Sequence, residues 1–278
     1  MPNKRNLFSI GLLVVVLFLT GAVCSPQENQ FVVDQLSLTS LFVKIYRNDV
    51  EIGSATGFVV EKNHKHYLVT NRHVVLLCAQ DRNQSNIGGW ICANKLSIFH
   101  NRLGHLGEWL WVEENLFDAH GNKRWLEHPK LCSGADLVAL PLEQTENVQF
   151  YPLDLNLGKS EITLGPGDPV SIVGFPFGLA QEAGLPIWKT GTVASDLDIN
   201  YNGKPIFLVD TTARPGMSGS PVYAVRTGAF RGANGALQMA VPGPAKKFLG
   251  VYSEQIPFAE IGGVWKSEAV MALYDSLP

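Results

Sequence analysis

Residues 214–222 read RPGMSGSPV, a run of small residues that leads into an apolar segment. Pro215 fixes its own φ angle, and Gly216 and Gly219 allow backbone conformations and close approaches that a Cβ atom would block. A loop of this kind can aim two main-chain N–H groups at one point, and we expect the amides of Gly216 and Ser218 to do so. A bare Gly-x-Ser-Gly also occurs in ordinary turns, so Ser218 is a candidate nucleophile only if other residues support it.

A serine hydroxyl is a weak nucleophile at neutral pH, so it needs a base and a group that orients the base. Residues 67–75 (YLVTNRHVV) place His73 just past an apolar strand, and residues 134–140 (GADLVAL) place Asp136 at the entrance to another. A carboxylate there is partly buried and needs a partner, which an imidazole N–H can provide. Singly, His73 could be a core histidine and Asp136 a turn residue. Together with Ser218 they predict a catalytic triad.

Three motifs resemble those of the chymotrypsin-fold (trypsin-like) serine peptidases, especially the exported bacterial members without a PDZ domain. Residues 70–75 (TNRHVV) resemble the base motif, residues 135–140 (ADLVAL) the acid motif, and residues 215–222 (PGMSGSPV) the nucleophile loop. Their order along the chain also matches. The resemblance extends from about residue 41 to the C-terminus.

This resemblance implies an all-β fold of two antiparallel six-stranded β-barrels, with the active site in the cleft between them, and a C-terminal helix. It implies a serine endopeptidase that hydrolyses peptide bonds through an acyl-enzyme intermediate. His73 would act as general base and then acid, Asp136 would orient it, and Ser218 would be the nucleophile. Gly216 and Ser218 would form the oxyanion hole. The resemblance also implies that the substrates are proteins or peptides, and we expect no cofactor.

The resemblance also locates a substrate pocket. In the family, the residue six before the nucleophile lies at the pocket base, which is Thr212 here, and a later strand forms a wall, here with Ser253 and Glu254. Because Thr212 is neutral, we expect a preference for uncharged side chains of small to medium size. Met217 replaces the aspartate that some members pair with a newly cut N-terminus, so we do not expect activation of that kind.

The rest of the chain consists of short β-rich runs separated by Gly, Pro and Asn, which favours antiparallel sheets. These runs are 41–46, 56–61, 66–70, 96–99, 110–112, 137–142, 169–173, 191–195, 206–210, 221–225 and 248–253. The tail has a helical pattern, with Ser267 as its cap. We divide the chain into an export segment (1–24), a spacer (25–34) and a peptidase domain (35–278), the last comprising a first barrel (about 35–155), a second barrel (about 156–265) and a helix (267–277).

The N-terminus has the layout of a signal peptide or membrane anchor. Lys4 and Arg5 precede an apolar run at residues 7–19, and small residues follow it. Cys24 could be a lipidated cysteine, although Val23 is larger than the residue expected before one. We expect export to the periplasm or the extracellular space, with membrane attachment through this segment or Cys24 as an open alternative.

The net charge limits the classes of partner, and the cysteines limit the possible disulfides. The formal net charge of -3 offers no basic surface for nucleic acid. Export permits disulfides, and Cys78, Cys92 and Cys132 remain beyond Cys24. Because three is odd, at most one pair forms among them, and the sequence leaves open which.

Residues 79–130 form an elaborated loop of the first barrel, with a hairpin tip at residues 118–122. This loop contains four tryptophans and four histidines: Trp90, Trp109, Trp111, Trp125, His100, His105, His120 and His128. The histidines lack the spacing of a zinc site, so we expect no metal. The tryptophans favour core packing, with an aromatic binding face as the alternative.

Two other functions fit parts of this pattern. A catalytically silent or very slow trypsin-like domain could act as a protein-binding module, with residues 79–130 as its contact surface. An intact set of triad residues argues against it. An esterase of the α/β-hydrolase type would need a Gly-x-Ser-x-Gly elbow and another order of partners, which the chain lacks.

Overall fold

The computed structural model describes residues 33–80, 90–212 and 214–278. The chain divides into two compact units, Met1–Val32 and Val33–Pro278. The predicted export segment, Cys24 and most of the spacer fall in the first unit, which lies outside the described residues. None of the helices in the described part of the chain is long and apolar enough to cross a membrane.

Eight antiparallel strands form one sheet in the first half of the second unit. They are β1 (Ser40–Arg47), β2 (Val50–Lys62), β3 (Lys65–Thr70), β6 (Lys95–Arg102), β7 (His105–Asn115), β8 (Leu126–Glu127), β9 (Val138–Pro141) and β10 (Val148–Gln149). The order is β10-β6-β1-β2-β3-β9-β8, and β7 pairs with β6. Val43, Leu68 and Leu96 are completely buried in its core.

This first sheet differs in detail from the expected six-stranded barrel. It has eight strands, and β6, β7 and β8 all come from the elaborated loop at residues 79–130. Its end strands β8 and β10 have two residues each and pair with β9 and β6, not with each other. The loop therefore extends the sheet. The β-rich runs at 96–99 and 110–112 had predicted β6 and β7, but not β8.

The second half is a closed antiparallel barrel of six strands, as predicted. They are β11 (Pro169–Gly174), β12 (Ile187–Val193), β13 (Ile206–Asp210), β14 (Pro221–Arg231), β15 (Leu237–Ile256) and β16 (Ile261–Lys266), in the order β11-β12-β13-β16-β15-β14. All eleven runs predicted as β-rich overlap strands, and nine of them lie entirely within one. The sequence did not reveal β16, because two glycines interrupt its apolar pattern. Gly262 is required there, since a Cβ atom would collide with the ring of Tyr252.

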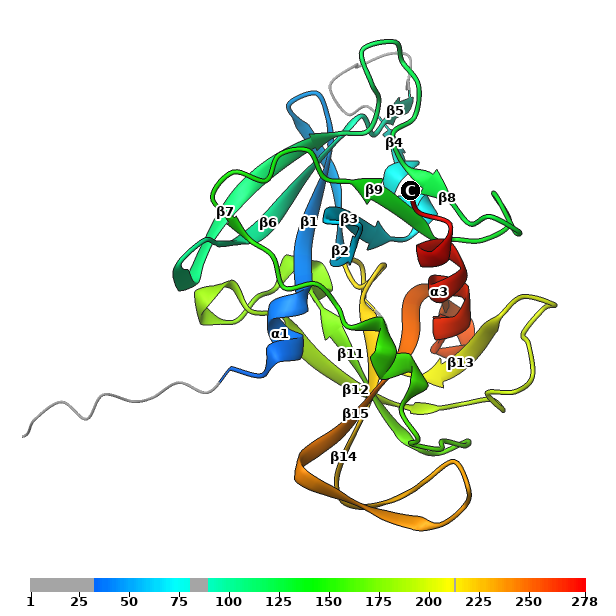
Figure 1. Cartoon of the computed structure of the whole chain (residues 1–278). Helices are drawn as coiled ribbons and strands as arrows, with labels where there is room; N and C mark the ends of the chain where they lie inside the picture. The colour runs from blue at the N-terminus through cyan, green and yellow to red at the C-terminus, as the bar shows by residue number, and fades with distance from the viewer. Residues whose placement is uncertain (1–32, 81–89, 213) are drawn as a thin grey trace, which may run out of the picture. The chain divides into compact units, whose positions relative to one another are not determined.

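Short helices complete the fold. They are α1 (Gln35–Thr39), α2 (Arg72–Val75), α3 (Ser267–Asp275) and the 3₁₀ turns η1 (Leu155–Lys159), η2 (Pro176–Gly178), η3 (Glu182–Gly184) and η4 (Pro257–Ala259). The predicted C-terminal helix is α3, which packs against β15 and β16 and reaches β9 of the first sheet (Figure 1). The cap prediction was wrong by one residue. Strand β16 runs straight into the helix, so its last residue, Lys266, occupies the N-cap position without a side-chain cap.

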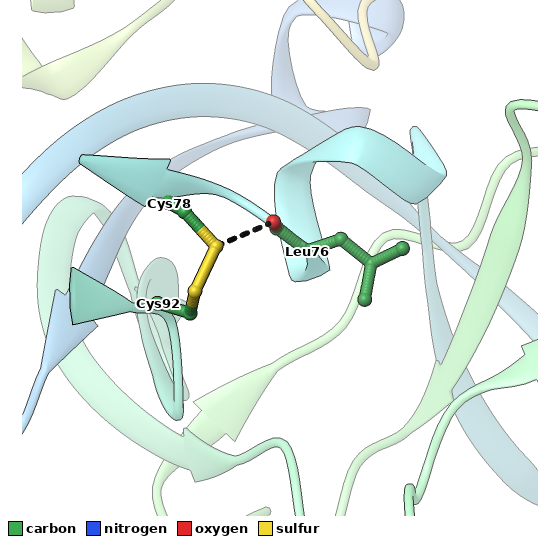
Figure 2. Close-up of a disulfide and its surroundings, with 3 residues drawn as sticks. All are labelled: Leu76, Cys78 and Cys92. Atoms are coloured by element: carbon green, nitrogen blue, oxygen red, sulfur yellow. Dashed lines mark hydrogen bonds between the residues drawn. A yellow bond between two sulfur atoms is a disulfide. The ribbon is translucent and has the colours of Figure 1, made fainter. Parts of the chain in front are cut away.

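The elaborated loop contains a small disulfide-bonded ribbon. Strands β4 (Cys78–Gln80) and β5 (Trp90–Cys92) pair, and Cys78 and Cys92 form a disulfide with their Cα atoms 3.9 Å apart. Figure 2 shows this bond beside Leu76, the C-cap residue of α2. Cys132 is free and exposed. The pairing that the sequence left open is thus settled.

The tryptophans of this loop serve different roles. Trp125 is buried in the core of the first sheet, and Trp109 stacks on Phe99. Trp90 is 71% exposed, so it adds nothing to that core. Core packing therefore explains part of this aromatic set, as expected, but not all of it.

Candidate active site

His73 lies in α2, a single helical turn directly after β3. Its N-cap residue Asn71 is extended and completely buried, and Asn71 Nδ2 donates a hydrogen bond to the backbone oxygen of Asp136 (2.8 Å). Val74 and Val75 pack into the core of the first sheet. The turn therefore has a fixed backbone, while the His73 side chain stays 46% exposed.

Asp136 lies two residues before β9 and makes two hydrogen bonds with His73. The backbone N–H of His73 donates to Oδ1 (2.8 Å), and Nδ1 of the ring lies 2.7 Å from Oδ2. These two bonds fix both the position of the histidine and the orientation of its ring. The hydroxyl of Ser253, in β15 of the barrel, donates to the same Oδ2 (2.5 Å).

Opposing effects set the pKa of the Asp136 carboxyl. Burial acts to raise this pKa, because a carboxylate loses hydration in the protein. The hydrogen bond and charge of His73, helped by the Ser253 hydroxyl, lower it and prevail, so the pKa lies below its ordinary value. The ionised carboxylate can only accept, so the proton of a neutral His73 ring sits on Nδ1 and Nε2 keeps its lone pair.

Ser218 lies in the loop that precedes β14, and the two glycines beside it adopt the expected backbone conformations. Gly216 has φ 94° and Gly219 has φ 86°, both in the left-handed region that favours glycine. A Cβ atom on Gly216 would collide with the backbone oxygen of Phe175, and one on Gly219 with that of Thr56. The loop therefore packs tightly against both halves of the fold.

Ser253 links Ser218 to the pair formed by His73 and Asp136. The Ser218 hydroxyl donates to the backbone oxygen of Ser253 (3.4 Å), and the Ser253 hydroxyl donates to Asp136. One residue thus contacts both the candidate nucleophile and the candidate acid. Between Ser218 Oγ and His73 there is no hydrogen bond in the part of the chain that the structure describes.

The amides of Gly216 and Ser218 are the predicted anion-binding donors. Within residues 33–80, 90–212 and 214–278, neither amide donates a hydrogen bond to another protein group. Free donors in a tight loop can stabilise a negative oxygen, because they need no rearrangement to do so.

Sequence reasoning missed one residue of this site and one contact. Ser253 was predicted for a pocket wall, and its contact with Asp136 was not foreseen. Thr56, in β2, makes three hydrogen bonds to the nucleophile loop and η2, and nothing in the run SATGFVV distinguished it from an ordinary strand threonine. Both contacts join residues more than 100 positions apart, so no local spacing could indicate them.

The other predicted pocket residues are less defined. Thr212 is partly buried, next to residue 213, which lies outside the described residues. Glu254 lies in β15, but its side chain is outside the described part of the structure. Tyr252 points into the barrel core, as the strand alternation allowed.

Among the described residues, no group of three or more His, Cys, Asp or Glu side chains could hold a metal ion. A cavity of about 480 Å³ opens beside the start of α3 and one of about 420 Å³ beside η1. Neither of these two cavities is lined by His73, Asp136 or Ser218.

Residues 55–232, more than half of the chain, match the family model of the trypsin-like peptidase domain. No protein of curated function matches the sequence.

Similar solved structures include three bacterial or extremophile proteases. A serine endoprotease from Yersinia pestis is 14% identical with a TM-score of 0.47, over 87% of this chain and 66% of its own. The active form of a protease from M. tuberculosis is 14% identical with a TM-score of 0.47, over 86% and 81%. A thermostable serine protease from an extremophilic microorganism is 15% identical with a TM-score of 0.44, over 87% and 99%.

Proposed function

Since the chain belongs to the trypsin-like peptidases, a family of serine endopeptidases, we propose that it hydrolyses peptide bonds through an acyl-enzyme formed on Ser218. In this proposal His73 is the general base and acid, Asp136 orients it, and the amides of Gly216 and Ser218 form the oxyanion hole. The observation that carries it is the pair of hydrogen bonds between His73 and Asp136, with Ser253 joining Asp136 to Ser218.

In the acylation step, Nε2 of His73 removes the proton from Ser218 Oγ as this oxygen attacks the scissile carbonyl carbon. The hydroxyl must first turn from the Ser253 oxygen toward Nε2. Asp136 stabilises the imidazolium that forms, and the two amides bind the oxyanion. His73 then gives its proton to the leaving amine, and the C–N bond breaks.

In the deacylation step, a water molecule replaces the leaving amine. Nε2 removes a proton from the water, whose oxygen attacks the ester carbon, and the same oxyanion donors stabilise the second tetrahedral intermediate. His73 returns the proton to Ser218 Oγ as the ester bond breaks. The product acid departs, and the protein is restored with no net change in protonation.

Reaction with a fluorophosphonate probe tests this proposal against the silent binding module. We expect the wild type to be labelled at Ser218 and to cleave a denatured protein substrate. The matched control is Ser220→Ala, since Ser220 is buried and its hydroxyl has no hydrogen-bond partner among the described residues. A wild type that is folded yet neither labelled nor active would favour the binding module.

Substrate preference is the second part of the proposal. Neutral Thr212 at the pocket base supports selection of uncharged side chains of small to medium size before the scissile bond. Cleavage-site profiling with a peptide library measures this directly. A profile dominated by Arg, Lys or Glu at that position would contradict the assignment of the pocket.

Export to the periplasm or the extracellular space is the third part. The basic, apolar and small-residue layout of residues 1–24 supports it, as does the Cys78–Cys92 pair, because disulfides persist in oxidising compartments. Attachment to a membrane through the apolar run or Cys24 stays an alternative. Fractionation of cells, with N-terminal sequencing of the product, separates cleavage from retention.

A further inference from the structure

Thr56 occupies an unusual position between the two halves of the fold. It lies in β2 of the first sheet and is completely buried. Its hydroxyl donates to the backbone oxygen of Gly216 (2.8 Å) and accepts a hydrogen bond from the backbone N–H of Phe175 (3.1 Å). One hydroxyl thus joins the nucleophile loop to the segment that leads into η2.

The backbone of Thr56 adds two further bonds. Its N–H donates to the backbone oxygen of Ser218 (2.8 Å), and its own backbone oxygen accepts from the hydroxyl of Thr70 (2.8 Å). The carbonyls of Gly216 and Ser218 are therefore both held by Thr56. The peptide between Met217 and Ser218, which carries the Ser218 N–H, lies between these two held carbonyls.

The peptide that carries the Gly216 N–H is held from η2. The backbone N–H of Phe177 donates to the oxygen of Pro215 (2.6 Å). In a trans peptide the C=O and N–H point in opposite directions, so this bond turns the Gly216 N–H away from η2. Since the Thr56 hydroxyl ties η2 to the nucleophile loop through Phe175, it influences the direction of both predicted oxyanion donors.

We propose that Thr56 is a positioning residue for the oxyanion hole, acting through its side-chain hydroxyl. The inference rests on the proposed function, since it assigns a role within that same site. Oxyanion donors are effective because they are oriented before the reaction begins. Without the Thr56 hydroxyl, the carbonyl of Gly216 and the N–H of Phe175 lose their shared partner, and the loop can relax toward orientations that stabilise the oxyanion less.

Thr56→Val and Thr56→Ser form the decisive pair of variants. Valine has nearly the shape of threonine without the hydroxyl, and serine keeps the hydroxyl. For Thr56→Val we expect kcat to fall about 10²-fold with KM nearly unchanged, the lower end for loss of one oxyanion donor. Thr56→Ser should stay close to the wild type. Thr39→Val is the matched control, because Thr39 is also buried and hydrogen-bonded, to the Leu36 oxygen and the Tyr223 hydroxyl, but makes no hydrogen bond to residues 214–220 among the described residues.

A purely structural role for Thr56 would lower the stability of Thr56→Val and leave its kcat similar to that of Thr39→Val. That result would overturn the inference. Affinity for a peptide aldehyde, which forms a tetrahedral adduct with the serine, should fall along with kcat, whereas affinity for the product peptide should not change. Equal losses for both ligands would also contradict the inference.

A readout without turnover separates this inference from the proposed function. In wild type and variants labelled with ¹⁵N-glycine and ¹⁵N-serine, we expect the amide resonances of Gly216 and Ser218 to shift in Thr56→Val and to stay in place in Thr56→Ser. If the wild type shows no turnover, the proposed function fails, but these spectra still decide whether Thr56 orients the two amides. Unchanged resonances in Thr56→Val would overturn the inference. If Thr56→Val does not fold, Thr56→Ala, which also lacks the hydroxyl, takes its place: shifted resonances would support the inference and unchanged ones would contradict it.

Discussion

The base–acid pair and the nucleophile loop are held in different ways. His73 and Asp136 are joined mainly through side chains, with the carboxylate accepting from the histidine ring, the histidine backbone and the Ser253 hydroxyl. The nucleophile loop is held through its backbone, because the oxygens of Pro215, Gly216 and Ser218 each accept a hydrogen bond from outside the loop.

This difference predicts which substitutions each region tolerates. A side-chain substitution in the pair removes a hydrogen bond directly, whereas in the loop it leaves the backbone bonds in place. The loop is vulnerable instead where a Cβ atom does not fit, as at Gly216 and Gly219. Among the side chains of this loop, we expect only the Ser218 hydroxyl to be essential, because it takes part in the proposed chemistry itself.

Ser218→Ala should have the largest effect, because it removes the proposed nucleophile. We expect a loss of about 10⁶ in kcat, as in comparable triads. The thermal midpoint should change little, since the hydroxyl makes one long hydrogen bond. Initial rates on a denatured protein substrate measure the loss, with Ser220→Ala as the control that should retain activity. Equal rates for Ser218→Ala and the wild type would remove Ser218 from the triad.

Asp136→Asn should come next. An amide at this position can donate to Nδ1 of His73, which favours the tautomer with its proton on Nε2, and we expect a loss of about 10⁴ in kcat. Asp154→Asn is a suitable control, since Asp154 only caps the 3₁₀ turn η1. If Asp136→Asn keeps a near-normal rate, the side-chain network of this pair is not what orients the histidine.

Ser253→Ala tests the link between the two regions. Loss of one hydrogen bond to a carboxylate should lower kcat by about tenfold. It should also raise the pKa of Asp136, because the Ser253 hydroxyl helps to lower it. A depressed carboxyl pKa contributes stability that is present above its unfolded-state pKa and is lost as pH falls through its folded-state pKa.

In Ser253→Ala the folded-state pKa should lie closer to the unfolded-state pKa, so the loss of stability on acidification should be smaller and should be complete at a higher pH than in the wild type. Urea unfolding at a series of acidic pH values measures this shift. Ser195→Ala, which removes a hydroxyl that bonds Leu208 N, provides the comparison. Coincident acid profiles for Ser253→Ala and the wild type would show that Ser253 does not influence Asp136.

The smallest effect on activity should come from the disulfide. A variant with both Cys78 and Cys92 replaced by serine should lose about 3 kcal/mol in free energy of unfolding, the chain-entropy value for a loop of this length. Its kcat should stay within about twofold of the wild type, because α2 is held by Asn71 and the core valines rather than by the ribbon. Urea unfolding and initial rates measure the two quantities. A much lower kcat in the folded variant would show that the ribbon also positions His73.

Much of the fold could be predicted because most strands have a recognisable pattern of apolar residues in the local sequence. The runs at 206–210 and 137–142 alternate or cluster apolar residues between turns, and both overlap strands. Strand β16 could not be predicted, because two glycines interrupt its apolar pattern, and one of them, Gly262, is explained only by the Tyr252 ring packed against it. The cap of α3 was misplaced for a similar reason, since nothing in the sequence indicates that a strand runs directly into the helix.

The sequence by itself determined which residue types stand in which local setting: a serine between two glycines, a histidine after a strand and an aspartate before one. It also determined the family, because three short motifs in order are specific. Only the tertiary structure decided that Cys78 pairs with Cys92, that Ser253 contacts both Asp136 and Ser218, and that Thr56 holds the nucleophile loop. Only folding brings together residues that lie far apart in the sequence. A hydrogen bond also depends on a separation of about 3 Å and on the direction of the donor, and the local sequence specifies neither.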